Sequence, residues 1–270
     1  MTRYRSIRAA AVTLVSVLFV SPLVFMFLGS LRTPGLPPPD GFELVPSLIR
    51  WENYQSVFLI VDLAPQLRNS LIVVLVSVPI TVLVASLAGY AIVASKPATR
   101  KALIVISVVV LMIPTGALLV PRFVMFRWLG LIDSLVALVA PALMATTPFY
   151  VLIFALAYSR IPRTLFEAAR VEGLRELAIW RRVAWPLGRP AAFAVGVLAF
   201  VFHWSNFIDA LLFIQSDERY TLPLGLRALQ TLEPSLHSIL LSGAVVATIP
   251  ALVAFLLVQR AFFTRTIEGR

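Results

Sequence analysis

The sequence predicts an all-α integral membrane protein with six membrane-spanning helices and a cytoplasmic helix-turn-helix element. Three observations support this fold class. Hydrophobic residues make up 60% of the 270 residues and charged residues only 13%, whereas a soluble globular protein carries about 25% charged residues. Long uncharged runs recur six times along the chain. Residues 160–189, between the fourth and fifth runs, form a strongly charged but helix-prone segment.

The six uncharged runs have the length that a membrane helix needs. The hydrocarbon core is about 30 Å thick and a helix rises about 1.5 Å per residue, so a span takes roughly 20 mostly apolar residues. We expect one transmembrane domain over residues 1–270. Its helices are predicted at about residues 9–31, 69–95, 102–121, 134–159, 190–214 and 234–259.

The first run, preceded by Arg3, Arg5 and Arg8, also has features of a signal peptide. A cleaved signal has an apolar core of about 7–15 residues followed by a small-residue cleavage site. This run is longer, and no convincing A-x-A site follows it. We therefore expect an uncleaved first helix.

The basic residues are distributed unevenly between the two predicted sides of the membrane. The formal net charge is +10, which can indicate nucleic-acid binding. With both termini on one side, however, 16 of the 23 Lys and Arg residues fall on that side. Cytoplasmic loops carry such an excess. The basicity thus predicts cytoplasmic termini, and no nucleic-acid partner is expected.

The predicted loops differ in length. Residues 32–67 form a long external segment that is too rich in proline for a continuous helix, although 51–58 is amphipathic enough for a short surface helix. Residues 215–233 are predicted as an external loop, and 96–101 and 122–133 as short turns. Most prolines inside the runs are expected to be ordinary kinks; they are Pro22, Pro79, Pro114, Pro141, Pro148 and Pro250.

Enzyme chemistry has little support in the sequence. The chain has no cysteine, which excludes disulfides, thiol catalysis and thiolate metal sites. His203 and His237 are the two histidines, and neither belongs to a catalytic motif such as HExxH. A GxxxxGK[ST] phosphate-binding loop is also missing from the sequence. No catalytic residue, metal site or cofactor is expected, and an intramembrane enzyme is the weakest alternative.

The charged segment 160–189 has the pattern of two helices joined by a turn. It holds seven Arg and three Glu residues, and each charge at the bilayer centre costs roughly 2.5–3.5 kcal/mol, so the segment lies outside the hydrocarbon. Pro162 suits a helix start, and Gly173 suits the left-handed conformation that closes a helix. Leu165, Phe166 and Ala169 share one face of the first helix, and an apolar stripe restarts at Leu174.

An amphipathic helix lying on lipid headgroups is the alternative interpretation of this segment. Anionic lipid would favour a purely basic face, whereas Glu167, Glu172 and Glu176 are interspersed among the arginines. Charges of both signs favour a protein partner.

The segment resembles the EAA loop of binding-protein-dependent ABC importer permeases. That pattern reads EAA, three residues, Gly, nine residues, Ile, one residue, Leu-Pro. The matching positions are Glu167, Ala168, Ala169, Gly173 and Pro186, with Val183 in place of the Ile and Trp185 in place of the Leu. Stretches 51–58, 69–73, 113–121, 220–226 and 242–260 look like the sugar-type branch, specifically its shorter, maltose-permease-like subunit.

This resemblance implies a type I-like importer fold and a set of partners. Residues 160–189 would form a coupling helix in a groove of a cytoplasmic ATP-binding subunit, through Glu167, Ala168, Ala169, Gly173, Leu174 and Pro186. Two copies of that subunit would bind ATP and Mg. A second permease would complete a heterodimer, and an extracytoplasmic solute-binding protein would deliver the solute. The chain would be a multi-pass protein of a bacterial or archaeal inner membrane.

Polar residues near the fifth run are candidates for the solute path. His203, Asn206 and Asp209 recur every third residue, with Trp204 beside them. Polar groups within membrane helices mark pathways by default, and an aromatic ring with hydrogen-bonding groups suits a sugar. Alternatively, Asp209 is solvated near the external mouth and His203 is a packing residue. Asp209 departs from the family pattern at this point.

The sequence leaves two alternatives open, one for the transported solute and one for the class of transporter. Glycerol phosphate or another polyol is an alternative to a sugar as the transported solute. An ion-coupled secondary transporter would need coupling carboxylates in the membrane, for which Asp209 alone is thin support.

Overall fold

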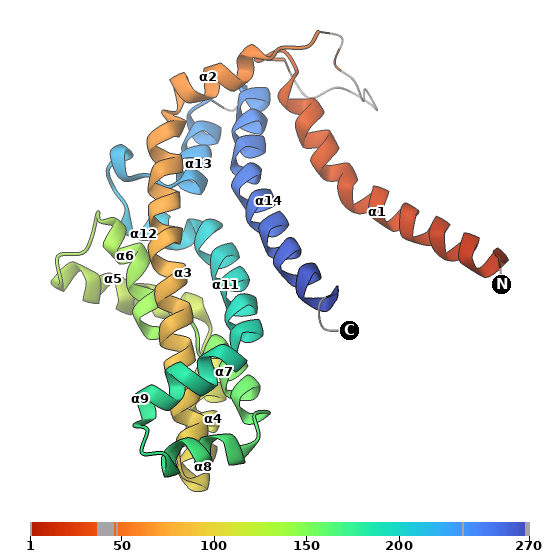
Figure 1. Cartoon of the computed structure of the whole chain (residues 1–270). Coiled ribbons are helices and arrows are strands. Elements are labelled where there is room, and N and C mark those ends of the chain that lie inside the picture. Colours follow the sequence, from red (N-terminus) through yellow and green to blue (C-terminus); the bar gives the residue numbers. More distant parts are fainter. Residues whose placement is uncertain (1, 37–45, 47, 234, 268–270) are drawn as a thin grey trace. The chain divides into compact units, whose positions relative to one another are not determined.

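The computed structural model describes residues 2–36, 46, 48–233 and 235–267, and every regular element in this part of the chain is a helix (Figure 1). This confirms the predicted all-α class. Pro37, Pro38 and Pro39 of the predicted external segment and Pro234, the predicted start of the sixth helix, lie outside the described residues.

The chain divides into two compact units, which are described separately. The first comprises Met1–Leu67 with Leu222–Val253, and the second comprises Arg68–Thr221 with Ala254–Arg270. The expectation of one transmembrane domain stays a prediction.

Four helices make up most of the described part of the first unit. They are α1 (Thr2–Ser30), α2 (Glu52–Ile60), α13 (Leu222–Leu232) and most of α14 (His237–Ile267). The Asn53 side-chain amide of α2 donates hydrogen bonds of 2.7 Å to the backbone carbonyls of Ser30 and Arg32. The Ser242 hydroxyl of α14 donates to the Asn53 carbonyl at 3.1 Å. The helix α2 confirms the short helix predicted at 51–58, and its buried asparagine ties α1 to α14.

One expectation for this unit is wrong, because residues 215–233 are not a plain loop. They contain α13, whose Leu222, Leu224 and Leu229 are buried. Leu222 and Leu229 are seven residues apart and so lie on the same face of the helix, whereas Leu224 lies on roughly the opposite side. The segment is too short to span a bilayer, and charged residues flank it, so its overall polarity hides the helix.

The second unit contains the remaining elements. Its α-helices are α3 (Leu63–Ala94, which begins in the first unit), α4 (Pro97–Leu111), α5 (Leu119–Trp128), α6 (Leu135–Val139), α7 (Pro148–Ser159), α8 (Arg163–Val171), α9 (Glu176–Ile179), α10 (Trp185–Leu187), α11 (Arg189–Trp204) and α12 (Phe207–Phe213). Short 3-10 turns cover Thr115–Leu118, Ala140–Met144 and Asp217–Arg219, and a π-helical turn covers Trp180–Ala184.

The described helices account for four to six membrane spans. Four are long and apolar enough on their own: Arg8–Ser30, Leu63–Ala94, Leu135–Ser159 and His237–Leu256. Two bent pairs raise the number to six if each pair is one span: Pro97–Leu111 with Thr115–Trp128, bent by 89°, and Glu176–Leu187 with Arg189–Trp204, bent by 80°.

Three of the predicted spans are interrupted and are not continuous α-helices. The third breaks before Pro114, since proline lacks the backbone N–H and disfavours helix at the residue before it. The fourth breaks at Ala145 and Thr146, which both have positive φ, and it restarts as α7, where the Thr147 hydroxyl accepts a hydrogen bond from the Phe149 N–H. The fifth breaks at Asn206, which caps α12.

The predicted turns are also shorter than expected. The helix α4 begins at Pro97, so only two residues separate it from α3, and α5 covers much of the expected turn at 122–133. Proline at the first helical position is favoured because its missing N–H has no intrahelical partner there.

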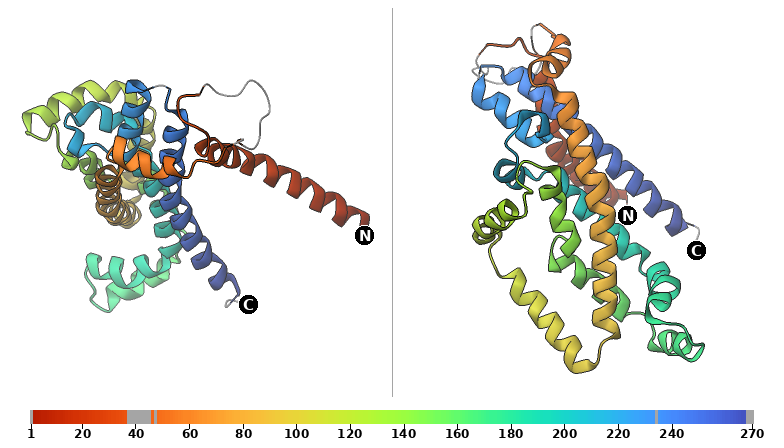
Figure 2. Two further views of the ribbon diagram at one scale, coloured as in Figure 1. Left: turned by 90° about the horizontal axis from the view of Figure 1, so that it is seen from above. Right: turned by 90° about the vertical axis from the view of Figure 1, so that its left-hand side faces the viewer.

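The helices α3 and α7 pack closely in the second unit; Figure 2 shows α3 as a long rod, seen nearly along its axis in the left view. A Cβ added to Gly89 of α3 would lie 2.5 Å from the Cβ of Phe154 and 2.9 Å from the backbone nitrogen of Ala155, both in α7. The position therefore requires glycine for the backbones to approach. Around it, side chains of α3, α7, α8, the π turn and α11 form one buried core.

Candidate coupling element and polar membrane site

The helix-turn-helix predicted at 160–189 is present. Pro162 precedes α8 as expected, and α8 ends where the N–H of Gly173 bonds to the carbonyl of Arg170 at 2.9 Å and the N–H of Leu174 to that of Ala169 at 3.1 Å. Gly173 has a φ of +79°, the left-handed conformation that only glycine adopts at low cost. The turn predicted from the sequence is confirmed.

The predicted coupling residues divide between two faces of the element. Ala169 is buried and Leu174 is partly buried against the core, whereas Glu167, Ala168 and Gly173 are exposed. The apolar side chains of Val171 and Leu177 are 88% and 66% exposed. An exposed patch with apolar side chains on a charged, two-helix element is the surface that a docking partner would cover.

Pro186, the last matching position of the EAA-like pattern, does not mark the end of a helix. It lies inside α10, directly after the π turn, and the chain bends beyond it at Gly188. A Cβ at Gly188 would come 2.4 Å from the ring of Tyr158, so a glycine is required where the bend packs on α7.

Side chains that the sequence analysis did not single out connect this element to α3. The Tyr90 hydroxyl donates to the Glu176 carboxylate at 2.5 Å, and the Trp180 indole donates to the Ser86 hydroxyl at 2.9 Å. The Ser86 hydroxyl also bonds to the hydroxyl of Tyr158 in α7 at 2.6 Å. The hydroxyls of Tyr90 and Ser86 within an apolar run and the indole of Trp180 are the only signal of these contacts in the sequence. No local pattern pairs Tyr90 with Glu176 or Ser86 with Trp180, because the partners are 86 and 94 positions apart.

The element also has an ion pair between Arg170 and Glu176, with a nitrogen–oxygen distance of 2.9 Å. Both side chains are about half exposed, at 42% and 56%. Exposed ion pairs contribute about 0–1 kcal/mol, so this pair adds little to the stability of the element, and the buried hydrogen bond from Trp180 to Ser86 is the firmer link to α3.

A buried polar cluster lies where α11 breaks into α12. The Arg122 guanidinium of α5 makes two parallel hydrogen bonds of 2.9 Å to the Asp209 carboxylate. The Asn206 amide donates to the same carboxylate at 3.0 Å, and its oxygen accepts from the Asp209 N–H at 3.2 Å. Phe126 and Phe213 lie beside the guanidinium, with ring centroids 5.9 and 5.2 Å from its carbon. Asp209 is therefore paired and buried, with its side chain 7% exposed, rather than solvated.

The other two path candidates lie on the neighbouring turn. The His203 Nε2 is 3.2 Å from the Thr146 hydroxyl, which is 2.7 Å from the Thr81 hydroxyl. His203 Nδ1 is buried without a hydrogen-bond partner among the described residues. The Trp204 ring stacks on Phe200 with 5.7 Å between centroids. The structure thus brings Asn206 and Asp209 together and places His203 against Thr146; their role in a solute path stays a prediction.

A second polar cluster holds the segment before α6. The Asp133 carboxylate accepts hydrogen bonds from the Gln215 and Ser216 backbone N–H groups, both at 3.0 Å, and pairs with Arg219 at 2.6 Å. These donors stabilise the charged form and lower the pKa of Asp133 from 3.8 to about 2. Asp133 has positive φ, so the cluster fixes an otherwise unfavourable backbone.

No group of three or more His, Cys, Asp or Glu side chains with a geometry for metal binding is found among the described residues.

The family of the chain follows from its match to a known family model. Residues 69–268 match the model described as the inner membrane component of binding-protein-dependent transport systems. The chain belongs to this family. The match covers the coupling element and the polar cluster together, and it agrees with the resemblance stated for residues 160–189.

Named permeases from several bacteria are similar over nearly the whole chain. The arabinooligosaccharide permease protein AraQ of Halalkalibacterium halodurans is 30% identical, covering 93% of this chain and 90% of that protein. The sulfoquinovosyl glycerol permease protein SmoH of Agrobacterium fabrum is 31% identical over 97% and 90%. The lactose permease protein LacG of Rhizobium radiobacter is 28% identical over 95% and 92%.

Solved structures show the same fold. A chain of a bacterial ABC transporter that imports the acidic polysaccharide alginate superposes with a TM-score of 0.77, covering 97% of both chains at 19% identity. A chain of an alginate transporter in complex with its pentasaccharide-bound periplasmic protein gives a TM-score of 0.67 at 16% identity. The type I-like importer fold is thereby shown.

Proposed function

We propose that this chain is the membrane-spanning permease subunit of an ATP-driven importer that carries a carbohydrate. The observation that supports this most directly is the coupling element, which presents exposed Glu167, Ala168 and Gly173 while Tyr90 and Ser86 attach it to a long membrane helix. The carbohydrate class is supported by the relatives, whose names specify arabinooligosaccharide, lactose and sulfoquinovosyl glycerol transport.

The proposed partners follow from this role. Two copies of a cytoplasmic ATP-binding subunit would dock on the coupling elements of this chain and of a second permease, and they would hold the ATP and Mg. This chain would perform no catalysis itself. An extracytoplasmic solute-binding protein would deliver the solute, as supported by the alginate transporter that was solved with its periplasmic protein.

The experiment that tests this function is uptake into proteoliposomes containing the assembled complex. Uptake of a labelled oligosaccharide should require ATP on the side of the ATP-binding subunits and should stop when those subunits are omitted. Uptake driven by an ion gradient without ATP would instead identify a secondary transporter. Comparing sugars with glycerol phosphate and polyols in the same assay tests the alternative solutes.

The proposed orientation places both termini and residues 160–189 in the cytoplasm. Because the chain has no cysteine, each introduced thiol is unique. We expect Arg175→Cys to react with a membrane-impermeant thiol reagent only when the inside is accessible. Arg227→Cys, in the exposed part of α13, should react in intact cells. The reverse pattern would show that the orientation is wrong.

Asn206→Leu tests the solute path. The substitution removes a polar side chain that caps α12 and bonds to Asp209. Loss of a hydrogen bond to a polar solute costs about 1–3 kcal/mol, or roughly 5- to 150-fold in affinity. We expect lower uptake per assembled complex.

The matched control for this variant is Asn206→Ser, which retains an oxygen that can cap α12. If the leucine variant lowers total uptake only because less complex assembles, the serine variant restores the yield, and uptake per assembled complex equals that of the parent in both variants. That result would remove Asn206 from the path.

A further inference from the structure

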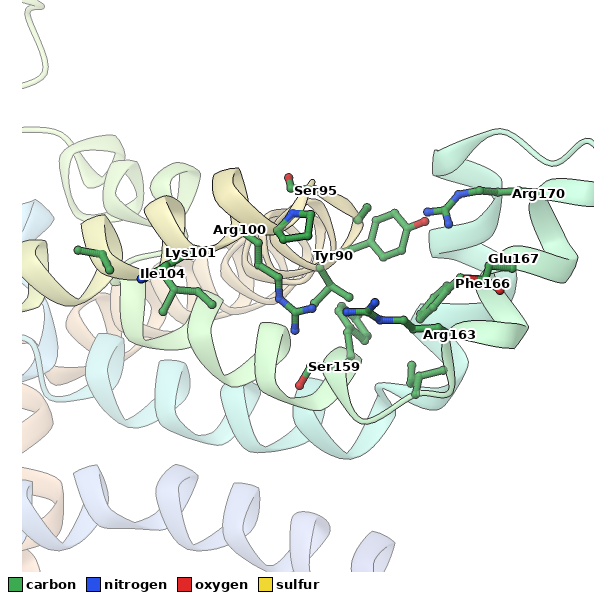
Figure 3. A pocket seen from close by; sticks show the side chains of 16 residues that line it. Tyr90, Ser95, Arg100, Lys101, Ile104, Ser159, Arg163, Phe166, Glu167 and Arg170 are labelled. Atoms are coloured by element: carbon green, nitrogen blue, oxygen red, sulfur yellow. The ribbon is translucent and has the colours of Figure 1, made fainter.

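A cavity of about 510 Å³ lies in the second unit between α3, α4, α7 and α8 (Figure 3). Its wall combines apolar side chains with four cationic ones and a single acidic one. The cationic residues are Arg100, Lys101, Arg163 and Arg170, and the acidic residue is Glu167.

Most of the positive charge in this pocket has no ion-pair partner among the residues that the structure describes. Arg170 is paired with Glu176, but within the described part of the chain Arg100, Lys101 and Arg163 form no ion pair. Figure 3 shows Arg100 of α4 and Arg163 of α8 pointing toward one another across the pocket. Three unpaired cations thus face one carboxylate. Like charges repel one another, whereas an anion placed between them is attracted to each and offsets that repulsion.

The apolar part of the wall continues onto an exposed apolar surface of α4. Ile104 and Val105 of α4 line the pocket, and α4 has no buried residue. Beyond the pocket, Ile106 and Val109 are 58% and 54% exposed. A ligand with an anionic group and an apolar tail fits this arrangement, because the tail can follow α4 while the anion stays among the cations.

The depth of the pocket in the membrane also suits a headgroup. Ser95 and Ser159, where two of the uncharged runs end, both line the cavity. The hydrocarbon ends where such runs end, so the cations lie at the level of lipid phosphates. Basic pockets between membrane helices on the cytoplasmic side bind anionic headgroups in this way.

We propose that this pocket binds the phosphate of an anionic membrane phospholipid, with its acyl chains along α4. The inference rests on the proposed function only for placing residues 160–189 at the cytoplasmic surface. Soluble phosphate offers the same anionic chemistry, but it would leave the apolar wall uncovered. An occupant here contacts Arg163 of α8 and Arg100 of α4 together, and it therefore holds the coupling element against the membrane helices.

The test measures lipid selectivity of the full chain in phosphatidylcholine vesicles. Trace spin-labelled phosphatidylglycerol and spin-labelled phosphatidylcholine are compared by the fraction immobilised at the protein. We expect phosphatidylglycerol to be preferred, and Arg100→Gln, Lys101→Gln and Arg163→Gln to weaken that preference by about fivefold for each cation removed, since an interfacial Lys or Arg contributes ~1 kcal/mol. The matched control combines Arg160→Gln, Arg181→Gln and Arg182→Gln, which remove the same charge from exposed positions outside the pocket.

Three outcomes would overturn the proposal. Equal loss of selectivity in the pocket and control variants would show that general surface charge, and not the pocket, causes the lipid preference. Displacement of the spin-labelled lipid by inorganic phosphate at the same ionic strength would identify a soluble anion as the occupant. Loss of selectivity in the fully assembled complex would mean that a partner's carboxylate fills the pocket. None of these readouts uses uptake or ATP hydrolysis, so failure here leaves the proposed transport function standing.

Discussion

Gly173→Asp is expected to abolish solute-stimulated ATP hydrolysis by the assembled complex while leaving the chain inserted in the membrane. Gly173 has a φ of +79°, and a residue with a side chain pays about 1–2 kcal/mol in that conformation. Apart from its two chain neighbours, no described residue has an atom within 4 Å of the position that its Cβ would take. A new side chain there projects away from the chain and into the space that a docked partner would occupy.

Gly130→Asp is the control that separates these two effects. Gly130 also has positive φ, +67°, and no atom of the described residues beyond its chain neighbours lies within 4 Å of an added Cβ, so the backbone strain is matched. It lies in a turn after α5, on the predicted external side. We expect this variant to retain stimulated hydrolysis. If both variants retain it, residues 160–189 form only a lipid-surface helix; if both lose it equally, strain rather than docking is responsible.

Arg122→Met is expected to destabilise the protein by ~3 kcal/mol, because it leaves the Asp209 carboxylate buried without its cation. The side chain of Asp209 is only 7% exposed, while that of Arg122 is 25% exposed. Breaking a buried pair at one end costs more than the pair itself contributes. Asn206 alone then remains as a donor to this carboxylate among the bonds described above.

The measurement is thermal unfolding of the purified chain in detergent, as a double-mutant cycle with Asp209→Leu. Removing both partners should recover much of the loss, since no unpaired charge is left behind. Arg127→Met on the same helix is the control, as Arg127 is exposed and forms no ion pair with a described residue. Additive losses from the two single changes would show that the pair is not coupled.

The coupling element was predictable from local sequence because its geometry is local. Pro162 and Gly173 act on the backbone of their own neighbourhood, through a missing N–H and a missing Cβ, and the ten residues between them fit one short helix. The same holds for α2. The span positions followed from hydropathy, which depends only on neighbouring residues.

The polar cluster was not predictable in the same way. Arg122 and Asp209 are 87 positions apart, and a charge that interrupts an uncharged run is naturally assigned to a loop. The bend before Pro114 changes that assignment, since it turns α5 and directs Arg122 toward α12. The breaks at Ala145 and Asn206 depend on capping and positive φ, which hydropathy does not register. The helix α13 was missed because it is shorter than any membrane span.

The contact at Gly89 has a mechanical consequence. Its neighbour Tyr90 bonds to Glu176 of the coupling element, and at Gly89 itself the backbones of α3 and α7 meet with no side chain between them. Long flexible side chains can accommodate a displacement by changing rotamers, whereas two backbones in direct contact cannot adjust in this way. If a docked partner displaces residues 160–189, the backbone contact at Gly89 therefore requires α3 and α7 to move together as one rigid pair.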